Sequence, residues 1–165
     1  MATAARIDAP DNASPHQSSE AVVVRFAGDS GDGMQLTGGQ FTLSSALAGN
    51  DFATFPDFPA EIRAPQGTIP GVSGYQLRFS SDAIYTPGDL CDVLVAMNAA
   101  ALKTNVKAIK KGGKIIANVD GFDSKNLRLA NYPDGVNPIE DGSLEGFELI
   151  KMDITKMTRE ALKDI

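Results

Sequence analysis

The sequence predicts an α/β domain of three layers, in which helices cover both faces of a mainly parallel β-sheet. Apolar runs without strict alternation, at residues 22–27, 91–97 and 114–119, are typical of strands that are buried on both faces. Segments with helical spacing of apolar residues, at 34–48 and 99–111, lie between the strands. The order strand, helix, strand, then strand, helix, strand, helix favours parallel strands joined by crossover helices.

The first strand runs into a glycine-rich loop, Gly-Asp-Ser-Gly-Asp-Gly, which is followed by a helix. Gly28, Gly31 and Gly33 permit backbone angles that a side chain would forbid. Such a loop presents amide groups beside the positive end of the helix dipole, so it is suited to hold a phosphate. Asp29 and Asp32 would repel an anion unless their side chains cap the helix or meet a cation. A tight structural turn remains an equally good interpretation of the loop.

The spacing of the loop excludes one common phosphate-binding motif and disfavours another. The triphosphatase loop needs Lys and then Ser or Thr after its last glycine, where this chain has Met34 and Gln35. The dinucleotide fingerprint has a glycine where Ser30 stands, and it needs an acidic residue at the end of the second strand. A free-standing oxidoreductase that binds NAD or a flavin is therefore only an alternative prediction.

Composition limits the functions further. The 165 residues suffice for one domain, and the net charge of -6 argues against nucleic acid or an anionic membrane as a partner. Cys91 is the only cysteine and His16 the only histidine, so the sequence offers no disulfide, zinc or iron-sulfur ligand set. We expect an intracellular, cytoplasmic location and no self-contained catalysis. Residues 1–20 carry no apolar periodicity and are predicted to be a disordered leader.

The helix at 34–48 carries no charged residue. Its apolar residues form two nearly opposite stripes, one with Met34 and Phe41 and one with Leu36, Leu43 and Leu47. One interpretation is that one stripe meets the sheet and the other a partner domain or subunit. The alternative is that the small polar residues of the helix simply face water.

Residues 55–74 carry four prolines, which exclude a helix. Because the segment also holds Phe and Ile side chains, we expect an ordered and partly exposed excursion. Arg63 in this excursion could grip a carboxylate or a phosphate with two hydrogen bonds. An ordinary surface ion pair with Asp57 or Glu61 is the competing interpretation.

Three predictions concern the middle of the chain. The alternation in residues 74–81 predicts a strand with one wetter face, near the sheet edge. Cys91 opens a buried strand and is expected to be a small core residue. Asn98 follows that strand, where it could contact a ligand or cap the next helix.

The predicted helix 99–111 has a row of lysines outward and is expected to stop at Gly112 and Gly113. The lysines could form a phosphate patch or a solvated face. A last strand at 147–152 leads to a helix that begins near Thr158 and still runs at Ile165. We therefore expect residues 21–165 to be one domain of a longer chain.

Five stretches, taken in order, resemble a known family: FAGDSGDGM, FPDFPAEIRAPQGT, GVSGYQLRFSS, DVLVAMN and KKGGKIIANVD. They resemble the gamma domain of the 2-oxoacid:ferredoxin oxidoreductases, as it occurs at the N-terminus of the fused gamma-alpha subunit. The resemblance runs from about Val22 to the end of the chain, and the proline-rich stretch is its most specific part.

The resemblance implies a division of labour between domains. Such enzymes oxidatively decarboxylate a 2-oxoacid, here expected to be 2-oxoglutarate, pass electrons to ferredoxin and release an acyl-CoA. Thiamine diphosphate, Mg and [4Fe-4S] clusters are expected on the alpha and beta domains or subunits of the complex. This domain is expected to contact coenzyme A and dock to those partners without being catalytic itself. By position, the implied coenzyme-binding residues are Gly28, Ser30, Gly31, Asp32, Gly33 and Arg63, with Asn98 as a further candidate.

Overall fold

The computed structural model describes residues 21–61 and 63–163. The predicted leader at 1–20 lies outside the described residues. The strands are β1 (Val22–Asp29), β2 (Asp51–Asp57), β3 (Val72–Ser80), β4 (Cys91–Ala96), β5 (Ile109–Asn118) and β6 (Glu148–Met152). The α-helices are α1 (Met34–Leu47), α2 (Ala99–Asn105), α3 (Ser124–Leu129) and α4 (Ile154–Ala161).

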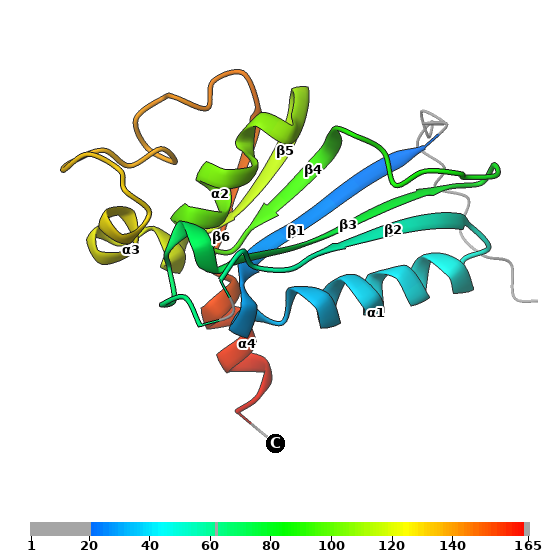
Figure 1. Ribbon diagram of the computed structural model, residues 1–165, viewed down its shortest axis with the longest axis horizontal. Helices are drawn as coiled ribbons and strands as arrows, with labels where there is room; N and C mark the ends of the chain where they lie inside the picture. The colour runs from blue at the N-terminus through cyan, green and yellow to red at the C-terminus, as the bar shows by residue number, and fades with distance from the viewer. Residues whose placement is uncertain (1–20, 62, 164–165) are drawn as a thin grey trace, which may run out of the picture.

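The strands form one six-stranded sheet in the order β2-β3-β1-β4-β5-β6, with helices on both faces (Figure 1). This confirms the predicted α/β fold. Strands β1, β4, β5 and β6 run parallel, whereas β3 pairs antiparallel with both β1 and β2. The sheet is mixed because β2 and β3 are joined without a crossover helix: their connection holds only the 3-10 turn Ile69–Gly71, and β3 returns antiparallel beside β2.

Strand β1 is the central strand that the apolar run predicted. Its side chains alternate between the two faces of the sheet. Val23 and Ala27 belong to the core on the α2 side, whereas Val24 and Phe26 pack with Met34 of α1 on the other side. Figure 1 shows α1 along one face and α2 on the opposite face.

Helix α2 is shorter than the predicted helix 99–111. It ends at Asn105, whose side-chain amide donates to Ala101 O (2.8 Å) and whose Oδ1 accepts from Arg25 Nε (2.6 Å). Strand β5 already begins at Ile109, so Gly112 and its neighbour lie inside a strand rather than at a helix stop. Gly112 has a φ of +73° at a register irregularity between β4 and β5, which is typical of a bulge.

The predicted lysine row is therefore not a single helical face. Lys103 lies over the ring of Tyr132 and donates to two backbone carbonyls. Lys110 lies on β5 and forms an ion pair with Asp92. Lys103 and Lys110 thus contact groups of the protein itself, and the interpretation of the remaining lysines as a phosphate patch stays a prediction.

Two further predictions concern individual strands. Cys91 is fully buried, as expected, and burial raises the pKa of its thiol to about 11. Strand β3 lies near the sheet edge, as predicted, with only β2 outside it. Its polar residues Gln76 and Ser80 are buried rather than wet. Gln76 accepts from Arg25 and donates to Gly88 O, so its polar groups are satisfied inside the protein.

Candidate functional site

The candidate site begins at the turn between β1 and α1. A short 3-10 turn, Ser30–Asp32, follows β1, and Gly33 has a left-handed φ of +73° before α1 starts. A Cβ on Gly28 would lie 2.7 Å from Asp32 Oδ2 and 3.0 Å from Met97 Cβ. Packing thus requires a glycine at position 28, and the left-handed backbone angle requires one at position 33. Gly31 is under neither constraint, because a Cβ added there would have Gln66 Nε2 as its nearest neighbour, at 3.4 Å.

Both carboxylates of the turn are directed onto backbone amides. Asp32 Oδ2 accepts from Asp29 N (2.8 Å), and Asp29 Oδ2 accepts from Gly67 N (2.8 Å). The second bond joins the proline-rich excursion to the glycine-rich turn. It brings together two segments that lie 38 positions apart in the chain.

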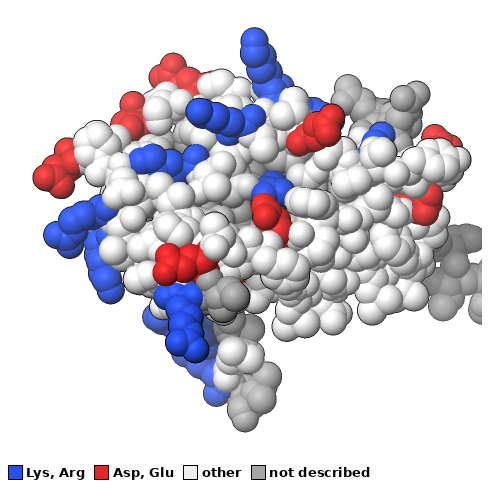
Figure 2. Space-filling view, in the orientation of Figure 1, with Lys and Arg blue, Asp and Glu red and all other residues white. Residues whose placement is uncertain are grey.

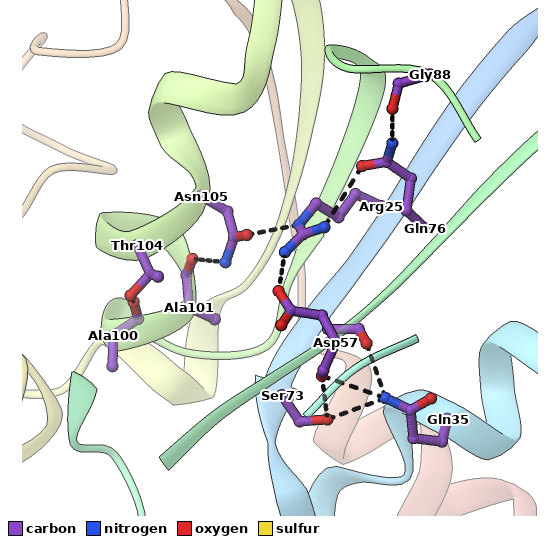
Figure 3. Close-up of polar contacts among 11 residues, drawn as sticks. Arg25, Gln35, Asp57, Ser73, Gln76, Gly88, Ala100, Ala101, Thr104 and Asn105 are labelled. Carbon is purple, nitrogen blue, oxygen red and sulfur yellow. Dashed lines mark hydrogen bonds and ion pairs between the residues drawn. The ribbon is translucent and has the colours of Figure 1, made fainter. Parts of the chain in front are cut away.

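The first turn of α1 has free amide groups. Its N-cap is Gly33, which has no side chain to cap the helix, and no other described residue supplies an acceptor to Met34 N or Gln35 N. The Gln35 side chain instead donates to Gly74 O (2.7 Å) and to Ser73 Oγ (3.2 Å), and Figure 3 shows the bond to Ser73. These bonds fix the start of α1 against β3, so the free amides have a set position.

A polar cavity of about 280 Å³ lies beside this turn. It opens where the parallel strands β1, β4 and β5 end, the edge at which ligands bind in open α/β sheets. Its charged lining residues are Asp29, Asp32, Asp120 and Lys125. Its carboxamide lining residues are Gln66, Asn98, Asn118 and Asn126.

Asp29 is 7% exposed, and burial raises the pKa of its carboxyl group. The nearby carboxylate of Asp32 raises the pKa as well, whereas the Gly67 amide and the side chain of Asn98 lower it. Asp29 Oδ1 is fully buried. The Asn98 side chain and the Asp32 backbone lie beside this carboxylate, so it belongs to the structure of the turn rather than to the open wall of the cavity.

The structure brings most of the predicted site residues together. Gly28, Ser30, Gly31, Asp32 and Gly33 form the turn, and Asp32 also lines the cavity with Asn98. Asn98 caps α2, since its Oδ1 accepts from Ala101 N (2.9 Å), so its two predicted roles are compatible. Arg63 has an exposed side chain and does not line the cavity, although its segment passes the turn at Gly67.

The sequence analysis missed several lining residues. Asn118 is the last residue of β5, at the same edge of the sheet as Asn98 after β4, so similar reasoning could have found it. Gln66 and Lys125 carry no such signal. Arg25 was also missed: its partly buried guanidinium forms an ion pair with Asp57 and donates to Asn105 Oδ1 (Figure 3). This network attaches the end of β2 to β1 and α2.

Two negative findings restrict the chemistry of the described residues. No group of three His, Cys, Asp or Glu side chains among them is arranged to hold a metal ion. None of the helices in the described ranges is long and apolar enough to cross a membrane.

Comparison with known proteins establishes the family. The family model for pyruvate ferredoxin/flavodoxin oxidoreductase matches residues 23–165. The chain belongs to this family. It is 50% identical over 159 residues to the 2-oxoglutarate oxidoreductase subunit KorA of Mycobacterium tuberculosis, a match that covers 96% of this chain and 24% of that protein. The chain thus spans about a quarter of the length of its curated relative.

Solved structures of other oxidoreductases share the fold. A 2-oxoglutarate:ferredoxin oxidoreductase from Magnetococcus marinus, with 2-oxoglutarate, coenzyme A and succinyl-CoA bound, matches with a TM-score of 0.65 and 29% identity, over 86% of this chain and 21% of that chain. The gamma subunit of a keto/oxoacid ferredoxin oxidoreductase from Geobacter sulfurreducens matches with a TM-score of 0.59 and 17% identity, over 87% of this chain and 66% of that chain.

Proposed function

We propose that this chain is the coenzyme A-contacting and docking domain of a 2-oxoacid:ferredoxin oxidoreductase that acts on 2-oxoglutarate. The coenzyme contact is inferred from the start of α1, which no side chain caps. The carboxylates of the preceding turn accept from the backbone amides of Asp29 and Gly67, so they do not block the start of the helix. The substrate is inferred from the 50% identity to a 2-oxoglutarate oxidoreductase subunit. Coenzyme A is inferred from its presence in the Magnetococcus structure.

The residues of the turn fit a phosphate in three respects. The free amides of α1 donate hydrogen bonds at the positive end of the helix dipole. Ser30 is exposed and adds a hydroxyl, and Gly31 leaves space for close approach to the backbone. Arg63 is exposed on the adjoining excursion and offers a cation for a phosphate held at the turn. When bound, coenzyme A supplies the thiol that accepts the acyl group.

Catalysis is assigned to the alpha and beta parts of the complex, with thiamine diphosphate, Mg and [4Fe-4S] clusters bound there and ferredoxin as the electron acceptor. The described part of this chain has no metal-binding cluster, and its one cysteine is buried. The role proposed for this domain is to position the coenzyme.

A separate observation supports the docking role. Leu36, Leu43 and Leu47 form an exposed stripe on α1, at 69%, 53% and 82% exposure, which we call the leucine stripe. Figure 2 shows that the surface over α1 lacks charged side chains, whereas basic side chains gather over α4. An apolar, uncharged surface of this kind is typical of an interface. The rest of the oxidoreductase is its proposed partner.

An amide NMR titration of the chain with coenzyme A, with NAD as the control ligand, tests the coenzyme contact. We expect shifts confined to residues 28–33, the first turn of α1 and the Arg63 segment, with coenzyme A alone. Gly31→Val should abolish these shifts, since it places a side chain in the phosphate path without strain in φ.

Gly146→Val is the matched control, because Gly146 has no neighbour within 4 Å and lies outside the site. It should leave the titration unchanged. Absence of shifts at millimolar coenzyme A, or equal shifts with NAD, would contradict the proposed contact.

A further inference from the structure

The two halves of the sheet are covered differently on the face that carries α1. Helix α1 packs on β1, β2 and β3, so it covers only half of that face. Strands β4, β5 and β6 form the other half, and Figure 1 shows that α4 leads away from the end of β6 rather than along these strands. On the opposite face, α2 and residues from the segment 130–147 share one apolar core with β4 and β5. Parallel strands normally need cover on both faces.

The uncovered half is apolar. The strand register places five apolar side chains on it, which together we call the open sheet face: Val93, Val95, Ile116, Ile150 and Met152. All five are partly exposed. The residues that alternate with them on the α2 side, Leu94, Ile115 and Ala117, are 0% exposed. Within the described part of the chain, the members on β5 and β6 belong to neither apolar core cluster.

The charges on this half of the sheet neutralise each other. Among the described residues of β4, β5 and β6, the register places two charged side chains on the α1 side, Lys114 and Glu148. They form an ion pair at one end of the open sheet face, with Lys114 Nζ 2.6 Å from Glu148 Oε2. The face therefore offers no free charge to a charged ligand, whereas an apolar partner would remove its side chains from water.

The dimensions of the open sheet face match one helix. Three strands at the usual spacing of about 4.8 Å span about 10 Å from the first axis to the third. A helix with its side chains is about 10 Å wide, and neighbouring helices pack about 8–10 Å apart. One helix beside α1 would thus cover β4, β5 and β6 and complete the helical layer on this face.

The relatives contain further chain from which such a helix could come. The match covers 24% of the Mycobacterium tuberculosis protein and 66% of the Geobacter gamma subunit, so even a separate gamma subunit has residues outside the match. Residues 1–20 of this chain are a poor source, because they lack the apolar periodicity of a packed helix.

We propose that an apolar helix from the remaining part of the oxidoreductase packs on the open sheet face, beside α1. The inference rests on the proposed docking role for the identity of the partner. It assigns that partner a second contact surface, which is distinct from the leucine stripe.

Cysteine labelling in the assembled oxidoreductase and in this chain alone tests the contact. Ile116→Cys places a thiol in the middle of the open sheet face, and Ile150→Cys is the second variant if the first does not fold. The native Cys91 is fully buried and its thiol pKa is raised to about 11, so it should react slowly at neutral pH. Peptide mass spectrometry measures the rate of iodoacetamide labelling at each site.

We expect assembly to slow the labelling of Ile116→Cys by about tenfold or more, because the reagent reaches a covered thiol only when the contact opens. Lys111→Cys is the matched control, since Lys111 is exposed on the same strand and lies outside the open sheet face. Its labelling rate should be nearly the same in both samples. Equal rates in both samples for Ile116→Cys and Ile150→Cys would overturn the inference.

Cross-linking identifies the segment that covers the face. Photoreactive methionine is incorporated into this chain before assembly, and cross-links from Met152 are mapped. We expect them in the remaining part of the oxidoreductase, at residues three or four positions apart, as on one side of a helix. Cross-links from Met152 to residues 1–20 or to a second copy of this chain would overturn the inference.

Leu43→Cys, on the leucine stripe, separates failure of this inference from failure of the proposed docking role. If assembly protects Leu43→Cys and leaves the open sheet face as reactive as before, the docking role stands and only this inference is wrong. If assembly protects neither surface, the docking role is wrong as well. If assembly protects the open sheet face alone, the inference stands and the leucine stripe is not a docking surface.

Discussion

Helices α1 and α2 cover opposite faces of the same sheet, but they differ in the kind of residue that each turns towards it. Helix α2 places Ala99, Ala100 and Leu102 in the core, all at 0–1% exposure. Helix α1 turns small or polar residues, Gly38 and Thr42, towards the sheet, while its leucines point outward. One helix completes its apolar packing within the chain, and the other does not.

The contact between α1 and β3 explains how a helix can pack this way. Gly38 lies directly on Tyr75, where a Cβ would come within 2.2 Å of the ring. The hydroxyl groups of Thr42 and Tyr75 lie 3.2 Å apart and share a hydrogen bond. Phe41 adds ring contacts with Phe26 and Phe79 at the helix flank. The sheet thus holds α1 by a close backbone approach, which leaves the leucine stripe for another surface.

We expect the two helices to differ most in how much stability the protein loses when one of their leucines is replaced by alanine. Leu102→Ala should lower the free energy of unfolding by about 2–5 kcal/mol, because it leaves a cavity in the α2 core. Leu43→Ala on the leucine stripe should change it by less than about 0.5 kcal/mol, since the side chain already meets solvent in this chain. Urea unfolding of both variants measures the difference. Equal losses would contradict the account of α1.

A neighbouring pair of glycines tests the close approach of α1. Gly38→Ala should destabilise the chain by about 1–3 kcal/mol, because the added methyl group overlaps the Tyr75 ring. The methyl group added by Gly39→Ala has no neighbour within 4 Å. This variant should therefore stabilise the chain by about 0.5–1 kcal/mol, because alanine has a higher helix propensity than glycine. Thermal unfolding of the two variants compares them directly. A neutral Gly38→Ala would mean that α1 does not pack tightly on β3.

The sequence was a good guide where one physical effect dominated. Local sequence alone was enough to predict three elements: the buried strand β1, the turn that follows it and the helix α1. The stripes of α1 were identified as well. Which stripe meets the sheet could not be decided, because the deciding contact of Gly38 with Tyr75 joins residues 37 positions apart.

Sequence reasoning failed where polar residues are buried. Gln76 alternates with apolar neighbours as a wet residue would, but its partners Arg25 and Gly88 lie in other segments. The end of α2 was misplaced for the same reason, since Asn105 is held by Arg25 of β1. In the candidate site, Asn98 was found from its place after a strand. Asp29 was predicted to repel an anion unless it capped the helix or met a cation, and its actual bond to Gly67 N could be found only from the fold.

The most direct test of the docking role is the affinity of this chain for the remainder of the oxidoreductase. Replacing Leu36, Leu43 and Leu47 by Ser should weaken association by at least about 30-fold, while the unfolding free energy of the chain stays nearly unchanged. Leu90→Ser, at a similarly exposed leucine outside α1, is the control and should associate like the wild type. Normal association of the triple variant would contradict the assignment of the leucine stripe as the docking surface.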